Sequence, residues 1–124
     1  MSNTAQEVSP LPENTQAQDY AEETAKWYLR GAEKGFHLAQ NSIGLCYYTG
    51  DGVEKNEQRA AYWFRCAAEQ GLAAAQFNLA WCYEHSEGLP LNIFQAAHWY
   101  TQAANQGYRK AQERLRILSS TQTE

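Results

Sequence analysis

The sequence predicts an all-α fold in which three helix hairpins stack into a solenoid, and an internal repeat is the main evidence. The stretch A-Y-W-F-R-C-A-A-E-Q-G at 61–71 has similar copies 36 residues upstream, A-K-W-Y-L-R-G-A-E-K-G at 25–35, and 36 residues downstream, A-H-W-Y-T-Q-A-A-N-Q-G at 97–107. Positions that hold the same residue in all three copies include Trp27/Trp63/Trp99, Ala32/Ala68/Ala104, Gly35/Gly71/Gly107, Ala39/Ala75/Ala111 and Gln40/Gln76/Gln112. A constant period of this length marks a stacked repeat array.

Helix caps and breakers between the copies are the second observation. Asp19 with Glu22 three residues later is a capping box that opens the first helix, and Asn56 and Asn92 are expected to cap the third and fifth helices. Glycines of the repeated series end the first helix of each hairpin. The expected helices cover residues 19–34, 37–49, 57–70, 73–85, 93–106 and 108–119.

The repeated tryptophans are expected to be the packing anchors of these hairpins. Small alanines let neighbouring helices approach closely, and Trp27, Trp63 and Trp99 would fill the space beside them in like surroundings. Replacing Trp63 by alanine should then cost about 3 to 5 kcal/mol through the cavity left behind.

The chain is expected to form one domain behind a polar tail. Residues 1–18 are rich in Ser, Thr, Asn, Gln and Pro and have no helical or strand period, which predicts a disordered N-terminal tail. The solenoid is expected over residues 19–119, with full repeats at about 39–74 and 75–110 and half repeats at 19–38 and 111–119.

Composition narrows the class of partner. The net charge of −4 argues against nucleic acid, which needs a basic footprint. The four basic residues of the last helix are interpreted as a solvated face, with an acidic or phosphate partner as the alternative. No apolar run is long enough to span a membrane, and no signal-peptide pattern is present, so we expect no membrane partner and a cytoplasmic location. The three cysteines, interpreted as reduced core residues, agree with a reducing compartment.

Few residue pairs in the sequence suggest chemistry. Cys82 and His85 supply half of a metal site, but no second pair lies at a suitable spacing. Glu84 and Glu87 stand at a helix end where no deep pocket is expected for acid–base catalysis. The G-D-G-V loop follows a helix and lacks the Lys-Ser/Thr of a phosphate-binding loop. We therefore expect no enzymatic activity and no metal or other cofactor.

The stretch A-Q-N-S-I-G-L-C-Y-Y-T-G-D-G-V-E-K-N-E-Q-R-A-A-Y-W-F-R-C-A-A-E-Q-G at 39–71 closely resembles the Sel-one-like repeat, a branch of the tetratricopeptide repeat superfamily. The resemblance implies a right-handed α-α superhelical solenoid that acts as a scaffold for other proteins, and it implies no reaction. One repeat departs from the pattern: Ala80 stands where Gly44 stands, and Ser86 and Leu89 replace the loop glycine and valine. The conformation of the second loop is therefore left open.

Positions that differ between the copies are candidates for recognition. In the resembling superfamily the inner helices line the concave side, and the spacing i, i+4, i+7 places one face of each helix there. The candidate partner-binding residues are Asn41, Leu45, Tyr48, Phe77, Trp81, Glu84 and His85. Trp81 leads because it stands outside the repeated tryptophan series, although it could instead fill a gap between inner helices. Phe77 leans toward packing.

The leading hypothesis is a non-catalytic protein-protein interaction scaffold that holds a peptide segment or helix of a partner protein in the concave groove. The alternative is a self-assembling structural module that forms a homo-oligomer. In that case the last helix, which lacks an outer partner, would form a homo-dimer through residues 109–119 and cover Leu115, Ile117 or Leu118.

Overall fold

The computed structural model describes residues 13–122, and within that range the chain forms six α-helices and no strand. The helices are α2 (Glu13–Glu33), α3 (His37–Thr49), α4 (Glu57–Glu69), α5 (Ala73–His85), α6 (Ile93–Asn105) and α7 (Arg109–Gln122). The all-α prediction is therefore confirmed, and four of the six expected helices begin where the sequence placed them.

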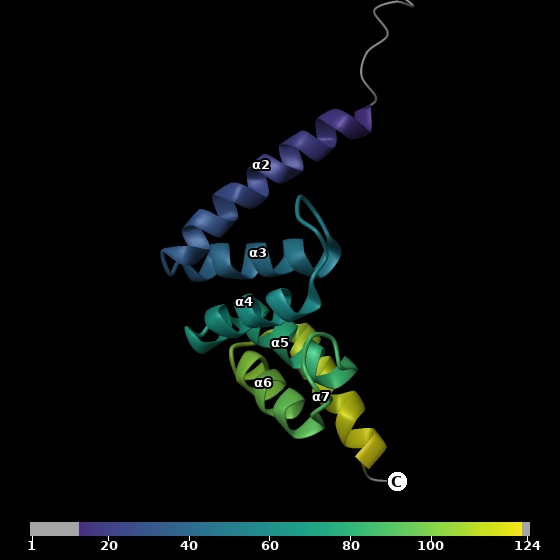
Figure 1. Ribbon diagram of the computed structural model, residues 1–124. Helices are drawn as coiled ribbons and strands as arrows, with labels where there is room; N and C mark the ends of the chain where they lie inside the picture. Colours follow the sequence, from purple (N-terminus) through teal and green to yellow (C-terminus); the bar gives the residue numbers. More distant parts are fainter. Residues whose placement is uncertain (1–12, 123–124) are drawn as a thin grey trace, which may run out of the picture.

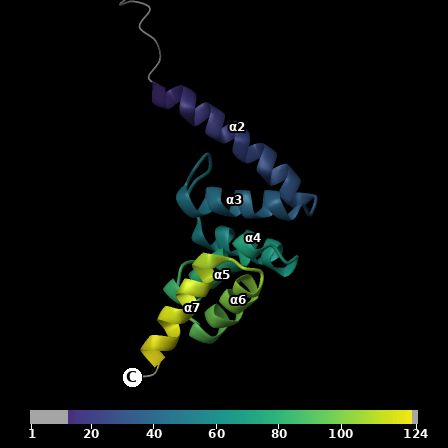
Figure 2. The same cartoon turned by 180° about the vertical axis from the view of Figure 1, so that it is seen from behind.

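The helices stack in chain order (Figure 1). Contacts run between consecutive helices, so α2 pairs with α3, α4 with α5, and α6 with α7, while α3·α4 and α5·α6 join one hairpin to the next. In both views α2 lies at one end of the stack and α7 at the other (Figures 1 and 2). This is the hairpin solenoid that the repeat predicted, with α3, α5 and α7 as the second helix of each hairpin.

Each hairpin turns at a glycine in the left-handed backbone region. Gly35, Gly71 and Gly107 have φ values of 93°, 97° and 87°, which side chains other than glycine rarely adopt. The N–H of Gly71 donates to the Ala68 carbonyl at 2.9 Å, and the N–H of Leu72 donates to the Ala67 carbonyl at 3.3 Å. These bonds satisfy the last carbonyls of the outer helix while the chain reverses.

Loops between hairpins have the same conformation in both copies. Asn56 accepts a hydrogen bond from the Arg59 N–H and Asn92 from the Gln95 N–H, each at 3.0 Å, so both expected caps are confirmed. Ser86 adopts φ 56° and ψ 44°, close to the left-handed conformation of Gly50 in the first loop. The second loop thus keeps its turn although serine has replaced glycine, at a cost of roughly 1–2 kcal/mol.

Each of these loops also packs on the outer helix of the preceding hairpin. A Cβ atom on Gly88 would lie 2.1 Å from the Glu57 carbonyl oxygen of α4, and one on Gly52 would lie 2.2 Å from the Ala21 carbonyl oxygen of α2. Only glycine permits such an approach of two backbones. The loop glycines therefore serve the contact between repeats as well as the turn.

A ladder of glutamine side chains fixes the register between hairpins. Within each hairpin, an amide nitrogen of the second helix donates to a carbonyl of the first: Gln40 to Ala32 at 3.2 Å, Gln76 to Ala68 at 3.2 Å and Gln112 to Ala104 at 3.1 Å. Across the boundary, Gln70 donates to the Gly35 carbonyl at 3.0 Å and to Gln40 Oε1 at 2.8 Å, and Gln106 does the same to Gly71 at 2.9 Å and Gln76 at 3.0 Å. Gln40 and Gln76 are buried, so these bonds also satisfy their amides.

In the second and third hairpins the core is anchored by the residue that follows the repeated tryptophan, whereas Tyr28, which follows Trp27, is 37% exposed. Phe64 and Tyr100 are fully buried, and Phe64 packs on the surface left free by Gly44. Trp63 and Trp99 are only partly buried against the core, whereas Trp27 is 61% exposed. The expectation that the three tryptophans share like surroundings was wrong: Trp27 lies in α2, the first described helix, and no hairpin among the described residues covers it from the preceding side.

The first helix is longer than expected. α2 begins at Glu13, so residues 13–18 are helical and Asp19 is not its cap; residues 1–12, the rest of the expected tail, lie outside the described part of the chain. Side-chain bonds one turn apart join Gln16 Nε2 to Tyr20 Oη and Gln18 Nε2 to Glu22 Oε2, each at 3.1 Å. Such pairs stabilise an exposed helix without apolar burial, which is why hydrophobic periodicity missed this segment.

Candidate protein-binding groove

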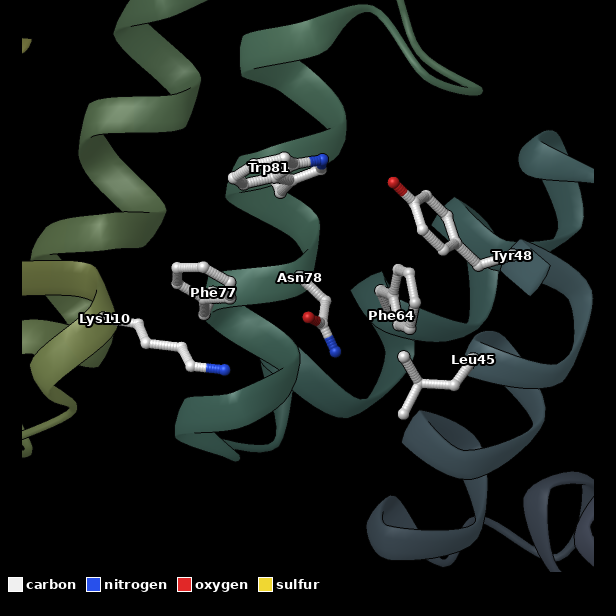
Figure 3. Close-up of a pocket in the computed structure, with 7 residues that line it drawn as sticks. All are labelled: Leu45, Tyr48, Phe64, Phe77, Asn78, Trp81 and Lys110. Atoms are coloured by element: carbon white, nitrogen blue, oxygen red, sulfur yellow. The ribbon is translucent and has the colours of Figure 1, made fainter. Parts of the chain in front are cut away.

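A groove of about 390 Å³ opens on the side of the solenoid formed by the inner helices (Figure 3). It is lined by Leu45 and Tyr48 of α3, Phe64 of α4, Phe77, Asn78 and Trp81 of α5, and Lys110 of α7. Most of these side chains are apolar, so the groove is a hydrophobic surface that the stack itself leaves uncovered.

Four of the seven candidate residues line this groove: Leu45, Tyr48, Phe77 and Trp81. Leu45 is 42% exposed, so the neighbouring hairpin leaves much of its side chain uncovered. In Figure 3 the indole nitrogen of Trp81 points toward the Tyr48 hydroxyl across the opening. Helices from adjacent repeats thus supply the two walls.

Tyr48 forms a fixed wall of the groove. Its hydroxyl donates to Glu87 Oε1 at 2.5 Å, and its ring lies 6.4 Å from the Phe64 ring. Burial and the bond to the Glu87 carboxylate raise the pKa of Tyr48 to about 12. The hydroxyl therefore stays protonated at neutral pH.

Trp81 is held by the side chains around it. Its ring stacks on His85 with centroids 3.9 Å apart, and the Arg114 guanidinium carbon lies 5.6 Å from the Trp81 ring centroid. The His85 ring nitrogen Nδ1 lies 3.1 Å from the Trp81 carbonyl oxygen. His85 is thus placed behind Trp81 rather than in the groove lining, and it limits the rotamers open to the indole.

Phe77 both packs and lines the groove. Its ring centroid lies 5.5 Å from that of Tyr100, 5.4 Å from that of Tyr108 and 6.1 Å from that of Trp81. This aromatic cluster ties α5 to α6 and to the start of α7. The groove therefore rests on a rigid base.

The remaining two candidates contribute outside the lining. Asn41 Oδ1 accepts a hydrogen bond from Asn78 Nδ2 at 3.0 Å, which orients Asn78 at the floor. Glu84, only 9% exposed at its side chain, accepts from Tyr100 Oη at 2.7 Å and from Arg114 Nε at 3.3 Å, and Arg114 also donates to it through Nη2. Glu84 therefore holds α5, α6 and α7 together.

Electrostatics at Glu84 follow from these contacts. Burial raises the pKa of the carboxyl, but hydrogen bonds from Arg114 and Tyr100 and the charge of Arg114 outweigh it, so the pKa of Glu84 lies below its ordinary value. For the same reason the pKa of Arg114 is raised. The pair is ionised at neutral pH.

Three residues of the groove were missed from the sequence: Phe64, Asn78 and Lys110. Phe64 lies in the repeated stretch at 61–71 and was not among the candidates, which were sought where the copies differ. Lys110 is one of the four basic residues of the last helix that were interpreted from the sequence as a solvated face. The equivalent position of α5 is Ala74, which indicates that the stack does not need a lysine there and could have marked Lys110 as a candidate.

The described residues 13–122 offer little support for a metal site or a membrane span. No group of three or more His, Cys, Asp or Glu side chains in this range is placed to hold a metal ion. None of the described helices combines the length and the apolar character needed to cross a membrane. All three cysteines are free, and burial raises the pKa of Cys82 to about 12.

Comparison with known families and structures identifies the repeat. The family model of the Sel1 repeat matches residues 17–36, 37–72 and 73–108. These matches have the expected period, and their boundaries fall two residues before those expected from the sequence. Among functionally curated proteins, none matches the sequence.

Two solved structures share the fold. One is a protective antigen present in uropathogenic Escherichia coli strains that displays an SLR fold: it is 33% identical with a TM-score of 0.72, and the match covers 73% of this chain and 19% of the antigen. The chain thus spans about a fifth of that antigen's length. The other is a Sel1 repeat protein from Oxalobacter formigenes, 37% identical with a TM-score of 0.72 over 74% of this chain and 69% of that protein. The chain belongs to the Sel1 repeat family.

Proposed function

We propose that this protein is a non-catalytic scaffold that binds a peptide segment or helix of another protein in the groove between α3, α5 and α7. Sel1 repeat proteins are generally protein-interaction scaffolds, which supports the class of function. The three free cysteines support a reducing compartment such as the cytoplasm.

The observation that carries this proposal is the open apolar groove itself. Leu45 and Trp81 occupy positions where the other copies have different residues, so the stack does not require them. Trp81 is nevertheless held by His85 and Arg114 with its edge in the groove. Preorganised aromatic anchors beside exposed apolar surface are typical of protein interfaces.

The test compares two double variants that remove equal kinds of surface. Leu45→Ala with Trp81→Ala empties the groove, whereas Leu91→Ala with Phe94→Ala removes exposed apolar side chains near the start of α6. Far-UV circular dichroism would first establish that both are folded. We expect the groove variant to lose partner capture in pull-downs from cells of the source organism, and the α6 variant to retain it. Equal capture by both would contradict the proposal.

Self-assembly through residues 109–119 is the second candidate, and Ile117 favours it because its side chain is 39% exposed on the last helix. Leu115 and Leu118, by contrast, pack on the core. Arg116 occupies the position at which Gly44 and Ala80 stand in the other inner helices. Since Phe64 packs against Gly44, a further outer helix on α7 would have to displace Arg116. Sedimentation at micromolar concentration decides between monomer and oligomer.

A further inference from the structure

The groove has an uncompensated positive edge. Lys110 is its charged lining residue, and in Figure 3 the Lys110 ammonium group extends from α7 toward Asn78. A second hollow of about 370 Å³ shares Phe77 and Lys110 with the groove and adds Arg109, Glu113 and Arg114. The two hollows therefore adjoin: Lys110 of the first turn of α7 lies where they meet, and Arg109 lines the second hollow.

Most charges around these hollows are already paired within the chain. Arg114 binds Glu84, and Arg116 binds Glu113. The Glu87 carboxylate accepts from Tyr48. Within residues 13–122, the side chains of Arg109 and Lys110 form neither a hydrogen bond nor an ion pair.

These two charges are specific to α7. The equivalent positions of α5 are Ala73 and Ala74, so the architecture of the repeat does not call for basic residues there. Their positive charge is also opposite in sign to that of the whole chain, whose net charge is −4. Two free cations beside an apolar groove favour an occupant that brings carboxylates, because complementary charge steers association and fixes the register of a bound segment.

We propose that the segment held in the groove is acidic: an apolar side chain enters between Leu45 and Trp81, and Asp or Glu side chains of the same segment reach Lys110 and Arg109. This inference rests on the proposed function and adds to it the chemistry of the partner. The spacing from Trp81 to Lys110 across Phe77 places the carboxylates toward the α7 side of the anchor.

The experiment selects ligands from a display library of random short peptides against the wild-type protein. The clones are then measured by fluorescence anisotropy against three double variants: Leu45→Ala with Trp81→Ala, Arg109→Glu with Lys110→Glu, and Lys26→Glu with Lys55→Glu. The last pair changes the net charge equally at exposed lysines outside both hollows. Circular dichroism and thermal unfolding verify that each variant is folded.

We expect clones that depend on Leu45 and Trp81 to be enriched in Asp and Glu beside an aromatic or aliphatic residue. Reversing the charges of Arg109 and Lys110 should weaken the affinity of these peptides by about tenfold or more, which corresponds to the loss of two partly exposed charge pairs. Reversing the charges of Lys26 and Lys55 should change the affinity of these peptides less than about twofold. Raising the salt concentration should weaken their binding to the wild type.

Two results are distinct failures. If groove-dependent clones show no acidic enrichment, or bind the variant reversed at 109 and 110 as well as the wild type, the acidic-partner inference is overturned while the proposed function stands. If no selected clone depends on Leu45 and Trp81, both fall.

Discussion

The contact between each loop and the preceding hairpin can be measured by adding one methyl group at Gly88. Gly88 has a φ of 79°, and a Cβ there would lie 2.1 Å from the Glu57 carbonyl oxygen and 2.5 Å from its carbonyl carbon. Gly71 is a matched control, because its φ is 97° but a Cβ would meet nothing within 4 Å. Both substitutions strain the backbone, and only the one at Gly88 also forces two repeats apart.

The magnitudes follow from this difference. An alanine at positive φ costs roughly 1–2 kcal/mol, which is the whole effect expected for Gly71→Ala. Overpacking against backbone that cannot move aside adds roughly 1–3 kcal/mol, so Gly88→Ala should cost about 2–5 kcal/mol. Urea unfolding followed by circular dichroism gives both free energies of unfolding. Equal losses for the two variants would show that the loop at Gly88 does not pack closely on α4. The account of how this loop joins the repeats would then be wrong.

Three further predictions concern single side chains. Gln76→Leu should lower the free energy of unfolding by about 2 kcal/mol, because it removes two side-chain hydrogen bonds, one to Ala68 within the hairpin and one from Gln106 of the next hairpin. Gln112→Leu removes one exposed hydrogen bond and should cost less than about 1 kcal/mol; denaturant titration compares the two variants. Ser86→Gly should stabilise by about 0.5–1 kcal/mol in the same titration by relieving the left-handed serine, and a loss would refute the strain. Because the folded pKa of Glu84 is lowered, its stabilisation is present above its ordinary value of 4.5 and is lost as the pH falls through the folded value. Stability measured against pH should therefore drop more steeply in acid for wild type than for Glu84→Gln, and parallel curves would contradict this.

The repeat made the fold predictable, because identical residues at a fixed period must occupy equivalent environments wherever neighbours exist on both sides. This reasoning located the turns at Gly35, Gly71 and Gly107 and the caps at Asn56 and Asn92. It failed at Trp27 in the first described helix, where no preceding hairpin within residues 13–122 covers the indole. The period of a sequence repeat does not show which hairpins have a neighbour on both sides.

The groove was only partly predictable for a related reason. Differences between copies pointed to Leu45, Tyr48 and Trp81, which the structure brings together on adjacent helices. Lys110 belongs to the hairpin after Trp81, and its approach depends on how successive hairpins turn relative to one another. Sequence spacing within one helix cannot supply that angle. Comparison with Ala74 marks Lys110 as a lysine that the repeat does not require, but its place in the groove came only from the structure.

Binding in the groove is tested most directly by nuclear magnetic resonance. A peptide selected against the wild type would be titrated into isotope-labelled protein, and the backbone amide shifts would be followed residue by residue. Scaffold function through the groove predicts that the largest changes cluster around Leu45, Trp81 and Lys110 on α3, α5 and α7. Changes that cluster instead on the outer helices α2, α4 and α6 would contradict it.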